Sequence, residues 1–268
     1  MGYDSTLFCG TYEYYAKYRP NVPEEVVQII IEQFDIKPVD RVLDIGCGTC
    51  QMAIAMNGKC NEMVCLDSDL EMLKQAKREL ERMNLKQKIV LVNCYAEDLI
   101  KRKNEFEIFK LVTICRAFHW MDQNKVLTDL DSLISEDGGI AIISDGSFWT
   151  GEEEWQNAVK KVVQKYLGKE RRAGKGTFKE SPEPWENIIS RSAFSVVESK
   201  EVEIVRTWTV ESIIGWLFSS SFASPKYFGN KIEKFKKDIN ETLLLINPDG
   251  VFNEHDHFNL ILASRPRK

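Results

Sequence analysis

Residues 42–49 have the sequence Val-Leu-Asp-Ile-Gly-Cys-Gly-Thr, in which a short apolar segment runs straight into two glycines separated by one residue. Residues 41–45 have the composition of a buried strand, and residues 51–56 suit a helix. Glycine permits the tight backbone that such a strand–turn–helix junction requires, and it lets a ligand approach with no Cβ in the way. The stretch therefore predicts a cofactor-binding loop at the end of a buried strand.

Strand and helix patterns alternate on both sides of this loop. Such alternation predicts a parallel sheet with helices on both faces. Right-handed crossovers then place the carboxyl ends of the strands at one edge, where α/β proteins bind ligands. The predicted strands of this part are 41–45, 63–66, 89–92, 109–115 and 140–144, and the predicted helices are 24–34, 51–56, 69–83 and 126–134.

Residues 146–268 follow a different pattern. A helix is predicted over 152–167, two more strands over 196–205 and 257–263, and aromatic-rich amphipathic helix over 210–245. The segment between these last two strands is too long for a simple connection. We therefore predict a doubly wound, mostly parallel seven-stranded sheet.

The domain organisation follows from the same patterns. Residues 1–145 would form the cofactor-binding core with an N-terminal cap segment. Residues 146–268 would complete the core, and they would carry a helical lid over about 206–250 before the final strand. A plain pair of packing helices is the alternative to a lid.

The composition is that of a folded, mildly acidic protein. The 268 residues are 43% hydrophobic and 29% charged, with a net charge of −5. No apolar run approaches the roughly 18 residues of a membrane helix, and no signal peptide is visible. The acidic balance gives no overall attraction to nucleic acid or anionic lipid. We expect a cytoplasmic protein, monomeric or homodimeric, that binds neither nucleic acid nor membrane.

The cysteines leave one alternative open. Seven cysteines, several of them in apolar stretches, fit a reducing compartment better than a disulfide framework. Cys47 and Cys50 form a C-x-x-C within the glycine loop, which would also suit a redox pair or half of a zinc site. Because Cys60 and Cys65 lack zinc-finger spacing and no histidine lies nearby, we expect no metal.

Two cofactor classes compete for the loop. The dinucleotide fingerprint G-x-G-x-x-G would need a third glycine where Gln51 stands. Asp44, just before the loop, would repel a pyrophosphate but attract an amino or sulfonium group. Asp67 closes the next predicted strand, 21 residues after Gly46, where a carboxylate can accept both hydrogen bonds of a ribose diol. These residues favour a cationic cofactor over NAD.

Further motifs carry a family resemblance. Residues 42–49, Asp67, and Ala-Glu-Asp-Leu at 96–99 resemble class I S-adenosylmethionine (SAM)-dependent methyltransferases. Ala-Phe-His-Trp at 117–120 and Tyr-Tyr-Ala-Lys-Tyr-Arg-Pro at 14–20 are similar to the small-molecule branch that includes trans-aconitate methyltransferase. The resemblance covers about residues 10–145 well and the C-terminal third loosely. It implies a Rossmann-like methyltransferase fold, with SAM as cofactor and S-adenosylhomocysteine as its product.

The resemblance also implies roles for individual residues. Gly46 and Gly48 would approach the methionine part of SAM, Asp44 its amino group, and Asp67 the ribose hydroxyls. Arg116 would lie near the methyl group. The residues expected to bind the cofactor are Tyr14, Tyr18, Arg19, Asp44, Gly46, Cys47, Gly48, Asp67, Ser68, Met72, Ala96, Glu97 and Arg116.

Three of these assignments have structural alternatives. Tyr14 and Tyr18 are four residues apart, so they could simply share one face of a helix. Arg116 could instead pair with a surface carboxylate. Asp69 is expected to cap the following helix and not to bind the cofactor.

His119 is the candidate catalytic residue. It could take a proton from a hydroxyl or amine nucleophile, or it could be a structural histidine packed under the lid. Methyl transfer needs alignment and desolvation more than a strong base, and a carboxylate nucleophile needs no base. Trp120, Trp216 and Phe222 are expected to line the substrate pocket, whereas His255 and His257 look like loop residues.

These observations favour a methyltransferase that acts on an oxygen or nitrogen of a small molecule, with a carboxylate among the candidate acceptors. An RNA or protein methyltransferase would share the cofactor site but would need an open acceptor surface. A non-catalytic SAM-binding regulator would have the same cofactor motifs. A NAD-dependent oxidoreductase is disfavoured by Gln51 and Asp44.

Overall fold

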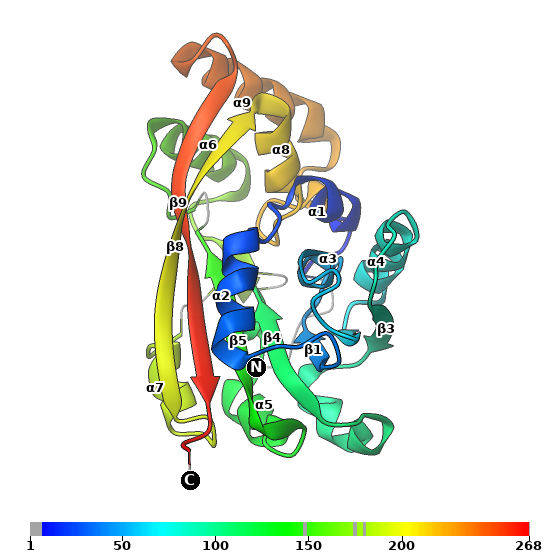
Figure 1. The fold of residues 1–268 in the computed structure, drawn as a ribbon. Helices are drawn as coiled ribbons and strands as arrows, with labels where there is room; N and C mark the ends of the chain where they lie inside the picture. The colour runs from blue at the N-terminus through cyan, green and yellow to red at the C-terminus, as the bar shows by residue number, and fades with distance from the viewer. Residues whose placement is uncertain (1–6, 147–148, 174–175, 179–180, 268) are drawn as a thin grey trace.

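A seven-stranded sheet forms the centre of the molecule, in the order β3-β2-β1-β4-β5-β9-β8 (Figure 1). The computed structural model describes residues 7–146, 149–173, 176–178 and 181–267. Five neighbouring strands are parallel, whereas β9 is antiparallel to both β5 and β8. The predicted doubly wound, mostly parallel sheet is confirmed. Its strands are β1 (Arg41–Ile45), β2 (Glu62–Asp67), β3 (Lys88–Asn93), β4 (Phe109–Cys115), β5 (Ile134–Asp145), β8 (Val196–Thr209) and β9 (Val251–Ser264).

Helices cover both faces of this sheet. Successive strand residues point to opposite faces, so that Val42 packs with the helices of one face and Leu43 with those of the other. Burial on both faces explains the continuous apolar runs of the central strands. One face carries α2 (Glu24–Phe34), α3 (Gln51–Ala55) and α4 (Leu70–Glu81), and the other carries η1 (Ala96–Glu105), α5 (Gln123–Leu130) and α7 (Trp185–Ser190).

A separate helical cluster stands beyond the carboxyl ends of the parallel strands (Figure 1). It consists of α6 (Glu154–Leu167), α8 (Val210–Phe218) and α9 (Ile232–Ile246), packed around their own apolar core. The strands β8 and β9 extend past the sheet as a long ribbon that carries the cluster. The N-terminal helix α1 (Tyr12–Tyr18) packs against α8. The segment expected as a lid thus consists of two helices on a strand ribbon.

The ribbon corrects one expectation about the last strand. β9 begins at Val251, six residues earlier than predicted, so His255 and His257 lie in a strand and not in a loop. Both histidines face outward and approach the carboxylates of Glu153 and Glu201, at 3.2 and 3.3 Å. The charged residues that alternate with them hid the strand pattern, because a strand with polar residues on both faces has no apolar period.

The remaining short elements connect these layers. Asp69 caps α4 by accepting hydrogen bonds from the backbone of Glu71 and Met72, as its sequence position predicted. The other short elements are η2 (Phe118–Trp120), the hairpin of β6 (Arg172–Ala173) and β7 (Gly176–Thr177), η3 (Pro225–Tyr227) and η4 (Gly229–Lys231).

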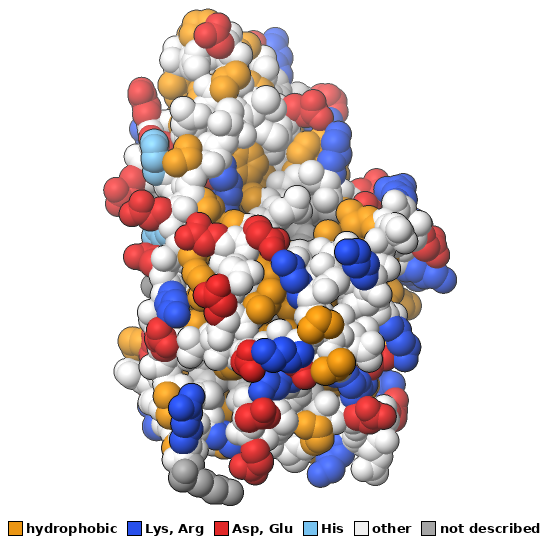
Figure 2. All heavy atoms as spheres, viewed as in Figure 1, with side chains coloured by type: hydrophobic (Ala, Val, Ile, Leu, Met, Phe, Trp, Pro, Cys, Tyr) orange, Lys and Arg blue, Asp and Glu red, His pale blue; other side chains and the backbone are white. Residues whose placement is uncertain are grey.

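The visible surface is of mixed charge. Figure 2 shows acidic and basic side chains interspersed over the face that carries α2. None of the helices in the described residues combines the length and the apolar character needed to cross a bilayer.

We expect Gly139→Ala to destabilise the fold. A Cβ at this position in β5 would lie 2.2 Å from the Phe34 ring and 2.4 Å from the Ala263 carbonyl oxygen, so α2 or β9 would have to shift. Overpacking of this kind costs about 1–3 kcal/mol, measured as the free energy of unfolding in urea. Gly176→Ala, where the new Cβ would have nothing closer than 3.9 Å, is the control. Equal unfolding midpoints for the two variants would contradict the packing described here.

Candidate functional site

The loop after β1 is shaped by two glycines. Gly46 and Gly48 have φ angles of 70° and 54°, a region that other residues rarely adopt. A Cβ on Gly46 would lie 2.4 Å from the Cβ of Ala117, so only glycine fits beside the turn after β4. The N–H groups of Gly46 and Cys47 donate to the Leu66 carbonyl at 2.8 and 3.0 Å, which holds the loop against β2.

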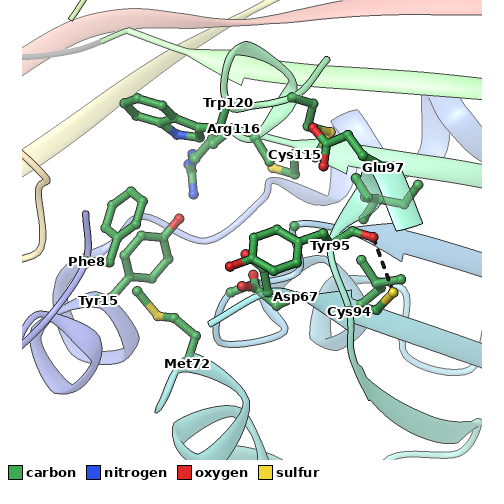
Figure 3. A pocket seen from close by; sticks show the side chains of 18 residues that line it. Phe8, Tyr15, Asp67, Met72, Cys94, Tyr95, Glu97, Cys115, Arg116 and Trp120 are labelled. Carbon is green, nitrogen blue, oxygen red and sulfur yellow. Dashed lines mark hydrogen bonds between the residues drawn. The ribbon is translucent and has the colours of Figure 1, made fainter. Parts of the chain in front are cut away.

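The carboxyl ends of β1, β2, β3 and β4 border a cavity of about 620 Å³. Figure 3 shows it between Phe8 and Tyr15 of the N-terminal segment and Tyr95 beyond β3. We call it the first cavity. Eight residues that the sequence assigned to the cofactor line it: Gly46, Gly48, Asp67, Ser68, Met72, Ala96, Glu97 and Arg116.

Two buried carboxylates flank the glycine loop. Asp67 accepts hydrogen bonds from the N–H groups of Gly48 and Asp69, both at 2.8 Å, and burial raises the pKa of Asp67 to about 6. Asp44 does not line the first cavity. Its Oδ1 accepts the Thr113 hydroxyl at 2.7 Å, while its Oδ2 has no partner among the described residues, and burial raises the pKa of Asp44 to about 7. A cationic ligand nearby would favour the ionised form of both groups.

Helix α1 presents a different face to the first cavity than the sequence indicated. The Tyr14 ring packs against Phe218 with 5.3 Å between centroids, and the Tyr18 hydroxyl donates to Glu211 at 2.7 Å. Both tyrosines therefore face α8, and neither is among the residues that line the cavity, so their assignment to the cofactor stays a prediction. Tyr15 lines it instead. The four-residue spacing of Tyr14 and Tyr18 reflects packing against α8, the alternative that helical periodicity allowed.

Cys47 also lies outside the lining of the first cavity, and its assignment to the cofactor stays a prediction. Its thiol is buried beside those of Cys50 and Cys65 beneath the glycine loop, and hydrogen bonds with the thiols of Cys47 and Cys65 lower the pKa of Cys50. Within the loop, the Cys47 N–H donates to the Leu66 carbonyl at 3.0 Å and the Cys47 thiol to the Gly48 carbonyl at 3.9 Å. Among the described residues, no group of three or more His, Cys, Asp or Glu side chains is arranged to hold a metal ion.

Arg116 joins three segments at the carboxyl end of β4. Its guanidinium makes a bidentate ion pair with Asp145 at the end of β5, with both N–O distances at 2.7 Å. Its Nη1 donates to the Pro20 carbonyl at 3.0 Å and to Oε1 of Gln51 at 3.2 Å. Burial opposes the charge on Arg116, but Asp145 raises its pKa. The carboxylate partner foreseen as an alternative for Arg116 exists, but it is buried and not at the surface.

A second cavity, of about 590 Å³, adjoins the first beside α8. Arg19, which the sequence assigned to the cofactor, lines this cavity and not the first one, and its role stays a prediction. The other residues that the sequence assigned to catalysis and substrate binding also line it: His119, Trp120, Trp216 and Phe222. Four residues line both cavities: Phe8, Tyr15, Arg116 and Trp120.

His119 is enclosed by aromatic rings. Its ring is parallel to that of Trp185 at 6.2 Å, and its centroid lies 4.4 Å from that of Trp120. Burial, with smaller contributions from Arg171 and Arg19, lowers the pKa of His119 to about 4. The imidazole is therefore neutral near pH 7, so one nitrogen can donate and the other can accept a hydrogen bond.

Sequence reasoning missed several residues of the two cavities. Cys94 and Tyr95 follow β3, and Asp145 ends β5, so the strand-end rule that identified Asp67 applied to them as well. Arg171 lies before the short β6–β7 hairpin, where the sequence has no strand or helix period. No local signal pointed to it.

Comparisons with known proteins agree with this geometry. The profile of a family described as "Methyltransferase domain" matches residues 42–138. A Saccharomyces cerevisiae protein named as the probable S-adenosylmethionine-dependent methyltransferase CRG1 is 27% identical over 128 residues, which are 48% of this chain and 43% of the yeast protein. An uncharacterized protein of Methanocaldococcus jannaschii is 28% identical over 239 residues, covering 83% of this chain and 87% of the archaeal one.

The solved structures show the shared fold. A type II methyltransferase candidate from Anaeromyxobacter dehalogenans superimposes with a TM-score of 0.58 at 16% identity, over 92% of this chain and 98% of that chain. The chain spans about half the length of the fungal relatives that it matches. The narrower resemblance to the trans-aconitate branch stays a prediction.

The stability of the protein should depend on Asp44 in a pH-dependent way. Its pKa is about 7 in the fold against an ordinary value of 3.8, so the unfolded chain loses this proton first and the folded state is penalised as pH rises from about 4 to 7. The measurement is the free energy of unfolding of Asp44→Asn and of wild type in urea, and the difference between the two. We expect this difference to rise in favour of the variant by about 1–3 kcal/mol from about pH 5 to about pH 8. Asp249→Asn, at an exposed turn, is the control. A difference that does not change with pH would contradict the burial of an ionised Asp44.

The glycine loop, the strand-end carboxylate Asp67 and the matches over residues 42–138 point to one family. The first cavity lies at the carboxyl ends of the parallel strands, and the glycine loop, Asp67 and Glu97 line it. Residues 42–138 match the methyltransferase domain, and this match, the fold and the named relatives support a class I SAM-dependent methyltransferase.

Proposed function

We propose that this protein transfers the methyl group of SAM to an oxygen or nitrogen of a small molecule, with a carboxylate among the candidate acceptor groups. One observation carries the proposal: the two cavities meet, and Phe8, Tyr15, Arg116 and Trp120 line both. An acceptor in the second cavity would face a cofactor in the first across these residues. Such a shared boundary is what an in-line displacement between two bound molecules requires.

Bound SAM would supply a methyl carbon on a positively charged sulfur, which leaves with its bonding electrons as the acceptor's lone pair forms the new bond. The glycine loop and Asp67 would hold the nucleoside, with Met72 and Ala96 among its apolar contacts. Asp44, beneath the loop, would balance positive charge on the cofactor. Aromatic walls exclude water from the path of the methyl group.

A small acceptor is favoured over RNA or protein because buried aromatic side chains line the second cavity. Trp216 of α8 and Phe222 after it are both buried and line this cavity, and the Trp149 ring packs on Phe222 at 5.3 Å. The interspersed charges in Figure 2 give that face no basic track for a phosphate backbone. On this proposal, α8 and α9 act as the lid that selects the acceptor. The cytoplasmic location and the monomeric or homodimeric state remain predictions.

Calorimetric titration tests the cofactor assignment. We expect SAM and S-adenosylhomocysteine to bind at micromolar Kd (about −8 kcal/mol) and NAD not to bind. Asp67→Asn should weaken both by roughly tenfold or more, since it removes a charged acceptor, while Asp249→Asn should not. Binding of NAD alone would refute the proposal. Binding of SAM without turnover of any acceptor would favour a SAM-binding regulator.

Substitution of His119 tests the chemistry proposed for the second cavity. We propose that its neutral imidazole receives the proton of a hydroxyl or amine acceptor, and for such an acceptor we expect His119→Gln to lower kcat by roughly 10²-fold. A carboxylate acceptor has no proton to give, so with a carboxylic acid the same substitution should lower kcat much less. Because burial lowers the pKa of His119 to about 4, the kcat of the wild type at saturating SAM should show no acid limb near pH 6.5. The pH–rate profile checks this. An inflection near pH 6.5 that disappears in His119→Gln would contradict the buried, neutral state.

A further inference from the structure

The second cavity has an excess of positive charge. Among the described residues that line it, the charged ones are Arg19, Arg116, Arg171 and Asp145. Both oxygens of Asp145 are already bonded, to Nε and Nη2 of Arg116 at 2.7 Å each and to Nη2 of Arg206 at 2.8 Å. The one carboxylate among these residues is therefore shared between two other arginines and does not pair with Arg19.

Arg19 is held in this cavity without an ion pair in the described part of the chain. Its guanidinium packs against the rings of Tyr15 and Trp216, with its carbon 5.0 and 4.8 Å from their centroids. Its Nε is buried and has no hydrogen-bond partner among the described residues. Burial lowers the pKa of Arg19, but a guanidinium remains protonated at neutral pH. A buried cation in this state is unfavourable unless a ligand brings the opposite charge.

The surroundings reinforce the positive potential. Arg171 packs on the Phe178 ring with its guanidinium carbon 4.1 Å from the centroid, and it lines the same cavity. His119, also in the cavity, has a pKa lowered by burial, so its imidazole is neutral near pH 7 and adds no charge to the cavity. The rest of the wall includes the aromatic rings of Trp120, Trp216 and Phe222. The cavity thus combines a cationic anchor with a wall that is partly aromatic and also includes Ser144, Ser220 and Ser221.

We propose that the second cavity binds a small carboxylic acid, with its carboxylate on Arg19 and its apolar skeleton against the aromatic wall. A guanidinium matches a carboxylate with two parallel hydrogen bonds, and such charge-assisted pairs are the strong ones. The single unpaired cation suits one carboxylate, and the aromatic rings suit a hydrocarbon or aryl skeleton. The inference rests on the proposed function, because it names the class of acceptor for the same site.

The test uses protein loaded with S-adenosylhomocysteine, so that no turnover occurs. The probes are phenylacetate and hexanoate, each compared with its neutral amide, and binding is followed by calorimetry. We expect each acid to bind the loaded wild type at least about tenfold more tightly than its amide, and Arg19→Gln to remove this preference. Arg19→Lys, which keeps the charge but not the planar fork, should restore part of it.

The controls distinguish acid binding by Arg19 from a structural role of this residue and from a role in cofactor binding. Arg172→Gln removes an exposed arginine that packs on Tyr227, outside the cavity, and should leave acid binding unchanged. Arg19→Gln should keep the affinity for S-adenosylhomocysteine within about threefold, because Arg19 does not line the first cavity.

Three results would overturn the inference: neither acid binds the loaded wild type, acids and amides bind alike, or Arg19→Gln leaves acid binding intact. Loss of S-adenosylhomocysteine affinity in Arg19→Gln, with acid binding retained, would assign Arg19 to the cofactor and also overturn it. Failure of the wild type to bind S-adenosylhomocysteine is a different outcome, since it would refute the proposed function itself.

Discussion

The buried ion pair between Arg116 and Asp145 is the interaction on which the site depends. It joins the ends of β4 and β5, and the same guanidinium holds the Pro20 carbonyl and Gln51. A buried arginine without its carboxylate would be strongly unfavourable, so the pair fixes the end of the N-terminal segment over the sheet edge. Arg206, on the ribbon, bonds to the same aspartate and brings β8 into the network. The core, the N-terminal segment and the β8–β9 ribbon are thus connected through the Arg116–Asp145 pair.

This arrangement explains why the two cavities adjoin and have lining residues in common. Arg116 has a positive φ of 58°, which places its side chain back across the sheet edge toward Asp145. The following residues, 117–120, then turn past the glycine loop, where Gly46 leaves room for Ala117. The turn that passes the glycine loop therefore places Trp120 at the boundary between the two cavities and His119 in the second cavity.

The sequence was most informative where a residue's role depends on its own strand or loop. Gly46, Gly48 and Asp67 were predictable because a strand end and a positive φ demand particular residue types. The packing of Tyr14 and Tyr18 on α8 was not predictable, because the motif does not say which face of α1 packs on α8. Arg19 could not be placed either, since its cavity is formed by α8, which lies almost 200 residues further along the chain. Local sequence patterns do not predict contacts between segments that are far apart in the chain.

The β8–β9 ribbon also determines which part of the molecule can yield most easily. Each strand runs for 14 residues, and the two stay paired from the sheet edge to the helical cluster, so tilting that cluster would break a ladder of backbone hydrogen bonds. Helix α1 is different, because none of its seven residues is fully buried, and it is tied to α8 by side chains such as Tyr18 on Glu211. The helical cluster is therefore held in place by backbone hydrogen bonds along the whole ribbon, whereas helix α1 is held by side-chain contacts that can be lost one at a time.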